Sequence, residues 1–154
     1  MSDGKFLAIT LRGSERSVGV LNLSTSEWFE SATGGGCQMT FLPGAGKNRV
    51  VRVNPTGNGG TELYAYDLDA NGKHGKLSAD QQKWIDLPGR RSHEYFPQPS
   101  PDGKWLVWAA TDRGHDHDIA DYEIFLLKVG ETADKAVRLT FHSGNDRWPD
   151  IWTK

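Results

Sequence analysis

A tight-turn motif that leads into an apolar strand occurs three times in the 154 residues, and it constrains the fold more than any other feature. The three turns lie 42 and then 57 residues apart, and they read Asp3-Gly4-Lys5 before FLAIT, Ala45-Gly46-Lys47 before NRVVRV, and Asp102-Gly103-Lys104 before WLVWAA. Glycine supplies the positive φ angle of a tight turn, and the β-branched and aromatic residues after it favour a buried strand. Recurrence at this period is typical of propellers. We therefore expect a chain built from similar β units.

Each turn is followed by two more strand-like segments and is preceded by one. The second strands are expected at 17–23, 62–68 and 122–129, and the outermost strands at 27–31, 83–87 and 136–141. The strands before the turns are expected at 38–42 and 96–100, with a further one at 148–152 that no later turn follows. Four strands per unit predicts an all-β fold, a β-propeller of three four-stranded blades.

In this assignment the chain begins at the second strand of its first blade and ends with an additional innermost strand. The strand order is therefore offset by one strand relative to the blades. Residues 1–154 are predicted to form a single propeller unit, with blades at about 3–37, 38–92 and 93–147 and a closing strand at 148–152. Such an offset lets two chain ends complete one blade and leaves no sheet edge exposed. Three blades are fewer than the four to eight that close a ring. Two alternatives follow: a homodimer that completes a six-bladed ring, or the C-terminal half of a longer propeller.

Composition excludes several classes of partner. The chain has 18 Lys and Arg against 20 Asp and Glu, a formal net charge of −2, so the basic surface of a nucleic-acid-binding protein is not expected. It has no apolar run long enough to span a membrane and no segment typical of a signal peptide. The single cysteine, Cys37, excludes an internal disulfide bond.

Three segments of the second half resemble one known repeat. FPQPSPDGKWLVW, DYEIFLL and RLTFHSGNDRWPDIW are similar to the repeat of the TolB-like β-propeller family, which is related in architecture to WD-repeat propellers. The resemblance is strong over 96–152, fair over 38–87 and weak over 3–31. It implies a soluble protein in the periplasm or another extracellular compartment, while the sequence itself leaves the compartment open. A shared fold does not by itself define an activity.

Polar loops predicted at one rim of the propeller are the candidate binding surface. Loops on a rigid sheet scaffold commonly carry function. The predicted rim residues come from three loops and are His93, Glu94, Tyr95, Asp112, Arg113, Asn145, Asp146 and Arg147.

The segment GHDHDIAD is the candidate metal site. Imidazole nitrogens and carboxylate oxygens are ligands for divalent metals, and the candidates are His115, His117, Asp118 and Asp121. A solvated polar loop explains the same residues, and Asp121 has the alternative role of starting the following strand. Residues 67–72 fit only the first half of a calcium loop, because Ser78 stands where a bidentate Glu is required.

Other chemical motifs are incomplete. No G-x-S-x-G nucleophile elbow occurs, and PGAGKN departs from a phosphate-binding loop. Cys37 is better explained as a small residue beside a strand than as a nucleophile. The large aromatic residues are expected to pack between blades, and they are Trp105, Trp108, Phe125, Trp148 and Trp152.

The sequence thus predicts a non-enzymatic scaffold that binds a protein or peptide through its rim, without a resident cofactor. The alternative is a metal-assisted lyase or hydrolase whose site lies in the channel of a closed ring. The resemblance to TolB-type pectic-oligosaccharide lyases implies that such a site would use His93, Gln98, His115 and His142.

Overall fold

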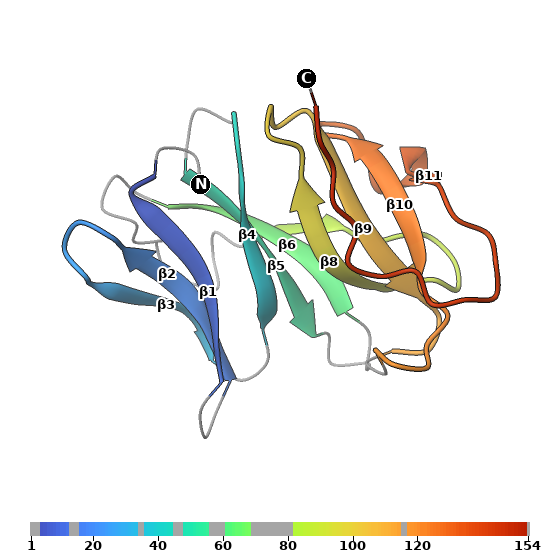
Figure 1. The fold of residues 1–154 in the computed structure, drawn as a ribbon, viewed down its shortest axis with the longest axis horizontal. Helices are drawn as coiled ribbons and strands as arrows, with labels where there is room; N and C mark the ends of the chain where they lie inside the picture. Colours follow the sequence, from blue (N-terminus) through green and yellow to red (C-terminus); the bar gives the residue numbers. More distant parts are fainter. Residues whose placement is uncertain are drawn as a thin grey trace.

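A computed structural model describes residues 4–12, 16–33, 36–44, 48–55, 61–68, 82–114 and 117–153. Its strands form three antiparallel meanders, arranged from left to right along the chain in Figure 1. The first meander contains β1 (Phe6–Arg12), β2 (Arg16–Asn22) and β3 (Trp28–Thr33). The second contains β4 (Cys37–Leu42), β5 (Asn48–Pro55), β6 (Thr61–Leu68) and β7 (Gln82–Ile85). The third contains β8 (His93–Pro99), β9 (Trp105–Thr111), β10 (Glu123–Lys128) and β11 (Val137–Arg138).

Within each meander, neighbouring strands in the chain are neighbours in the sheet. The second and third meanders meet at a single parallel pair, Thr61 with His93. Among the described residues the only helical element is a short 3-10 turn at Ala133–Lys135, and no helix there is long and apolar enough to cross a membrane. The described strands leave the arrangement open, because β1 pairs only with β2.

The apolar residues form two clusters, one at each junction between meanders. Phe6, Val18, Val20, Phe41 and Val50 belong to the cluster between the first and second meanders. Residues from β5, β6, β8, β9 and β10 form the larger cluster between the second and third. In β5, Val50 belongs to one cluster and Val51 to the other, so this strand is buried on both faces. A nearly continuous buried run is found in β9, whereas buried and half-buried residues alternate along much of β4, β6 and β10.

The turn between β8 and β9 shows why the SPDGK sequence recurs as a unit. Ser100 Oγ donates to Asp102 Oδ1 at 2.6 Å, and the same carboxylate oxygen accepts from the backbone N–H of Lys104. The N–H of Trp105 donates to Ser100 Oγ, and Gly103 has a φ of +68°. These bonds hold the pKa of Asp102 below its usual value, chiefly through Ser100. Gly4 also has a positive φ, while Gly46 lies outside the described residues.

Two predicted strands differ from the observed ones. The outermost strand expected at 136–141 is limited to β11, because the N–H of Ile124 donates to the side chain of Thr140 instead of to a backbone carbonyl. The segment 148–152 belongs to no strand in the structure. In Figure 1 it runs from the lower end of the third meander up past β8.

The aromatic core was predicted correctly only in part. Trp108 and Phe125 are buried and stack with their ring centroids 5.9 Å apart, whereas Trp105 is half-buried. Trp148 and Trp152 are 66% and 81% exposed, so their assignment to the core was wrong. Both residues lie in a segment that pairs with no strand among the described residues.

Candidate functional site

Three residues with a left-handed backbone occupy equivalent places near the centre of the structure. Gln38, Phe96 and Trp148 have φ angles of 52°, 56° and 62°. The first two interrupt the pairing of β4 with β5 and of β8 with β9. Residues other than glycine adopt this conformation at a cost of about 1–2 kcal/mol, so its repetition indicates a shared structural role. Trp148 therefore shares the backbone conformation that Gln38 and Phe96 adopt within β4 and β8, although residues 148–152 belong to no strand in the structure.

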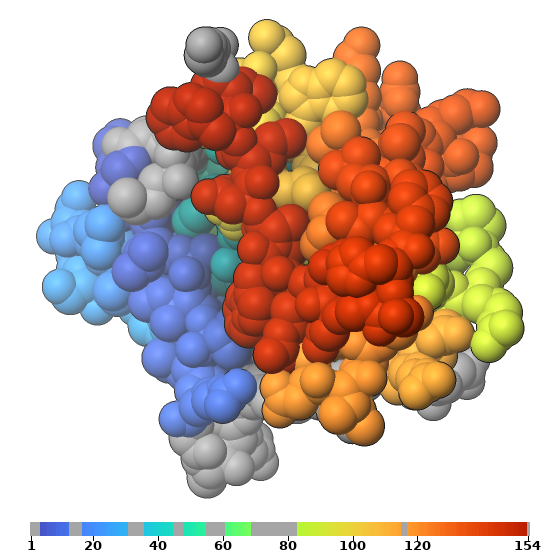
Figure 2. All heavy atoms as spheres, turned by 45° about the vertical axis from the view of Figure 1, so that its right-hand side comes forward, coloured from blue at the N-terminus to red at the C-terminus, as the bar shows by residue number. Residues whose placement is uncertain are grey.

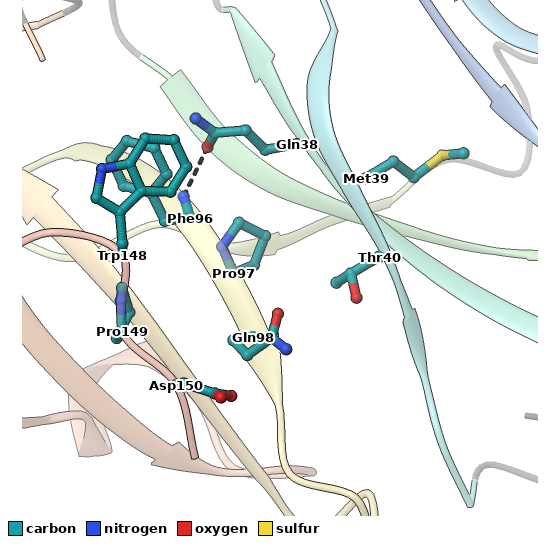
Figure 3. A pocket seen from close by; sticks show the side chains of 9 residues that line it. All are labelled: Gln38, Met39, Thr40, Phe96, Pro97, Gln98, Trp148, Pro149 and Asp150. Atoms are coloured by element: carbon teal, nitrogen blue, oxygen red, sulfur yellow. Dashed lines mark hydrogen bonds between the residues drawn. The ribbon is translucent and has the colours of Figure 1, made fainter. Parts of the chain in front are cut away.

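A pocket of about 400 Å³ lies where these three segments converge. Each segment contributes its left-handed residue and the two that follow, and the lining is Gln38, Met39, Thr40, Phe96, Pro97, Gln98, Trp148, Pro149 and Asp150. The N–H of Phe96 donates to Gln38 Oε1 at 2.7 Å, as the dashed line in Figure 3 shows. The rings of Phe96 and Trp148 lie 4.2 Å apart, and Figure 3 places Gln98 and Asp150 away from this aromatic pair. We call this the channel pocket; it has one aromatic wall and one polar wall.

A second pocket of about 690 Å³ adjoins the channel pocket and shares Gln38 and Trp148 with it. Its other lining residues are Thr10, Arg12, Cys37, His117, Asp118 and Arg147. We call it the mouth pocket. It combines two arginines, one carboxylate and one imidazole with an exposed tryptophan, so it offers both charged and apolar contacts.

Two of the predicted rim loops contribute to the mouth pocket, one through His117 and Asp118 and the other through Arg147, while Tyr95 in β8 packs against His117. Asn145 Nδ2 donates to the backbone carbonyl of His117 at 2.8 Å, and Arg147 donates to the same carbonyl. Arg147 also pairs with Asp118 at 3.0 Å. The ring of His117 packs edge-on against Tyr95 at a centroid distance of 4.7 Å. These contacts join three segments that are separated in the sequence by more than twenty residues.

The predicted rim residues differ in their exposure. Glu94 and Tyr95 are buried beneath the surface, and His93 is half-buried, which lowers the pKa of its imidazole. Asp112 accepts a hydrogen bond from Arg90 at 3.1 Å, while the Arg113 side chain is exposed. Asp146 pairs with His142 at 2.9 Å. The binding role of these eight residues remains a prediction.

The predicted metal ligands have other partners where the structure describes them. His117 Nδ1 lies 2.9 Å from the hydroxyl of Tyr122, and Asp121 pairs with Arg91 at 2.8 Å. His115 lies outside the described residues. Within the described part of the chain, no group of three or more His, Cys, Asp or Glu side chains is placed to hold a metal ion. The metal site stays an untested hypothesis.

The structure describes only some of the residues that were proposed for the lyase site and for the calcium loop. Gln98 lines the channel pocket, but His93 and His142 line neither pocket. Asp67, the first residue of the calcium-like segment, pairs with Arg49 at 2.7 Å, and residues 69–72 lie outside the described part.

Comparison with solved structures finds a relative of known fold. The crystal structure of TolB from Acinetobacter baumannii matches with a TM-score of 0.62 and 17% sequence identity. The match covers 94% of this chain and 32% of the TolB chain. The fold is TolB-like. No family model matches the sequence, and no curated protein matches it in sequence.

The TolB-like fold of this chain corresponds to about a third of the length of the TolB chain. At 17% identity the likeness concerns the fold alone. The strand order and the three meanders agree with the β-propeller class predicted from the repeats. The activity and partners of the TolB-like chain must be argued from its own pockets and loops.

Sequence reasoning did not select the left-handed residues that shape the channel pocket. A signal was present, because Phe96-Pro97 and Trp148-Pro149 are both aromatic-proline pairs at equivalent positions of the repeat. Trp148 was instead assigned to the core. The pattern of residue types indicates a large side chain at this position, but only the three-dimensional arrangement shows that it faces a pocket.

The buried carboxyl group of Glu94 should make stability depend on pH. Its Oε1 accepts from the N–H of Leu87 at 2.9 Å, and burial raises the pKa of the carboxyl group from its ordinary value of 4.5 to about 8. The unfolded state loses this proton first, so the free energy of unfolding should fall as pH rises from about 4.5 to about 8. We expect a fall on the order of 2 kcal/mol, since one pKa unit corresponds to about 1.4 kcal/mol and some hydration remains.

Urea unfolding at a series of pH values would measure this dependence. Glu94→Gln should remove most of the fall between pH 5 and pH 8, because the amide keeps an acceptor for Leu87 without titrating. Exposed Glu131→Ala is the control and should leave the dependence unchanged. A Glu94→Gln variant with the pH profile of the original protein would contradict the raised pKa.

Proposed function

We propose that this protein is a non-enzymatic, TolB-like propeller scaffold that binds a protein or peptide segment through its rim and the two adjoining pockets. The observation that carries the proposal is the contact of two rim loops at the mouth pocket, where Asn145 and Arg147 donate to the backbone carbonyl of His117 beside the exposed Trp148. Rigid meanders position these loops, and two apolar clusters hold the meanders together. Such an arrangement presents a preformed surface, which limits the entropy lost on binding.

The finer architecture belongs to the same proposal. The three meanders act as propeller blades at about 3–37, 38–92 and 93–147, and residues 148–152 act as a closing strand. The left-handed backbone shared by Gln38, Phe96 and Trp148 supports this assignment, because it occurs once in each proposed innermost strand. A blade before residue 37 would then lack its innermost strand, since the first meander contains β1, β2 and β3.

The chemistry of the pockets favours a peptide with both apolar and charged side chains. Trp148 is largely exposed and lines both pockets, and tryptophan and arginine are the residues that most often dominate binding energy. Arg12, Asp118 and Arg147 surround the same opening. The channel pocket has room for a side chain or two, and its polar wall offers amide and carboxylate partners.

Selection from a displayed library of twelve-residue peptides, followed by fluorescence anisotropy with a selected peptide, would test this function. Trp148→Ala should weaken binding of that peptide by at least tenfold, because it removes the aromatic wall shared by both pockets. Trp152→Ala is the matched control: it is the same change in the same segment, at a residue that lines neither pocket and is more exposed. It should change the affinity less than twofold.

Two results would contradict this proposal. Equal loss of affinity in both variants would show that the pockets are not the binding site, and no enriched peptide would argue against peptide recognition. Metal analysis separates the enzymatic alternative. One tightly bound metal ion per chain, with peptide affinity lost in chelator, would favour a metal-assisted site.

A further inference from the structure

Among the described residues, one terminal segment and one sheet edge have no backbone strand partner, although the N–H of Gln38 donates to the side chain of Thr10 at that edge at 3.1 Å. We infer that a second copy of this chain supplies each missing partner, so that residues 148–152 of each copy pair with β1 of the other. The mouth pocket is lined by residues from both ends of this arrangement, Thr10 and Arg12 on one side and Arg147 and Trp148 on the other. The inference concerns assembly and does not depend on peptide binding.

The sheet edge is that of β1. In the second and third meanders, the strand that follows the turn is central and pairs on both sides, as β5 does with β4 and β6, and β9 with β8 and β10. The equivalent strand of the first meander, β1, pairs with β2 alone. An unpaired edge of seven residues presents backbone donors and acceptors to another strand.

The terminal segment is 148–152. Trp148 has the left-handed conformation that Gln38 and Phe96 adopt inside paired strands, yet no ladder includes it. The N–H of Ile151 donates to the neighbouring carboxylate of Asp150 at 2.8 Å rather than to another strand. The segment thus begins with the same backbone conformation as the two paired segments that start at Gln38 and Phe96. Figure 2 shows it in red, crossing the face of the molecule between the first meander in blue and the third in orange.

The exposed large apolar side chains of the described residues lie in the first meander, the third meander and the terminal segment, the parts of the chain to which β1 and residues 148–152 belong. These side chains are Leu7, Leu11, Leu23, Ile119, Val137, Leu139, Phe141, Trp148 and Trp152. The second meander, which has a neighbour on each side, contributes none within its described residues. Contact between the two ends of different copies would cover this surface.

Exposed apolar side chains lie on both elements that are proposed to pair. Leu7 and Leu11 belong to β1, and Trp152 belongs to the terminal segment. Pairing of these two elements would shield the three side chains from water. In a two-fold arrangement β1 of each copy pairs with residues 148–152 of the other copy. Both junctions therefore form together, and neither copy keeps an unpaired edge at β1. Head-to-tail contact without this symmetry would instead extend into open fibres.

The repeats fix the register of the proposed pairing. Gln98 follows the left-handed Phe96 by two residues and pairs with Val107, and Thr40 holds the same place relative to Gln38 and pairs with Val51. Asp150 likewise follows the left-handed Trp148 by two residues. Val107 is the third residue after the turn lysine Lys104, whereas Val51 is the fourth after Lys47. The third repeat is the one that shares the Asp-Gly-Lys turn with the first, and the third residue after Lys5 is Ala8. Asp150 of one copy should therefore lie opposite Ala8 of the other.

The first test is the mass of the protein in solution. Light scattering after size exclusion should give twice the 17.1 kDa of one chain, and deletion of residues 148–154 should give a single-chain mass or aggregates. A single-chain mass for the intact protein across micromolar concentrations would overturn the inference. The missing strand would then come from another protein or from a longer form of the chain.

The second test does not depend on how well the truncated protein folds. Ala8→Cys combined with Asp150→Cys should form a covalent dimer under mild oxidation, seen on a non-reducing gel, because opposed residues in paired strands lie within reach of a disulfide. Leu11→Cys with Asp150→Cys is out of register and should cross-link at least fivefold less. The native Cys37 is buried and present in both variants. Equal cross-linking by both pairs, or a disulfide formed only within one chain, would overturn the proposed pairing.

Discussion

Replacement of Glu123 by alanine should lower the free energy of unfolding by about 3–5 kcal/mol, because it leaves a buried cluster of cationic and polar groups without their anion. Glu123 is fully buried, and its Oε1 lies 2.5 Å from Nη2 of Arg138. Its Oε2 accepts from Thr140 Oγ1 at 2.7 Å, and Arg91 lies 3.8 Å away. The carboxylate thus fixes the outermost segment of the third meander and contacts the loop from the second.

Urea unfolding of three variants would measure this effect. Glu123→Gln keeps an acceptor for Thr140 but removes the charge, so it should cost less than Glu123→Ala. Glu131→Ala, in an exposed turn after β10, should change stability by less than about 0.5 kcal/mol. If Glu123→Ala were no more damaging than Glu131→Ala, the buried network would have no structural importance.

Replacement of Gly103 by alanine should lower the free energy of unfolding by on the order of 4 kcal/mol, since two costs add. The first is the positive φ of +68°, which favours glycine. The second is steric: a Cβ atom there would overlap the carbonyl oxygen of Pro43 and lie 2.6 Å from its carbonyl carbon. Both atoms belong to the backbone of the neighbouring turn, so no side-chain rotation relieves the clash.

Gly130→Ala separates the two costs. Gly130 also has a positive φ, of 98°, but a Cβ atom there would meet nothing within 4 Å. We expect this variant to lose only about 1 kcal/mol in denaturant unfolding, the conformational cost alone. Similar losses in the two variants would mean that the turns at 43–44 and 101–103 do not approach each other closely in solution.

The turns and strands could be predicted from the sequence because their causes are local. Ser100, Asp102 and Gly103 form the turn before β9 within a few residues, and the apolar run after that turn reflects a strand that is buried along nearly its whole length. The segment Arg138-Leu139-Thr140 was recognised as part of a repeat, and the structure gives the reason. Arg138 and Thr140 both bind the carboxylate of Glu123.

The loop contacts could be predicted only in outline. The expectation that 91–95, 111–118 and 143–147 lie on one rim follows from strand order, and the structure brings their residues into contact through His117. The burial of Glu94 could not be predicted, because it depends on the distance between the loop after β7 and the start of β8. A charged residue in a polar loop sequence gives no sign of this packing.

The sequence by itself determined the all-β class, the position of most strands and the turns that join them, since these depend on residues within about ten positions of one another. Only the tertiary structure decided which aromatic residues are buried and where the pockets lie. Trp108 and Trp148 are the same residue type and both were expected in the core, yet Trp108 is fully buried and Trp148 is 66% exposed. The difference arises because β9 has a neighbour on each side, while the segment that contains Trp148 has no paired strand in the described chain.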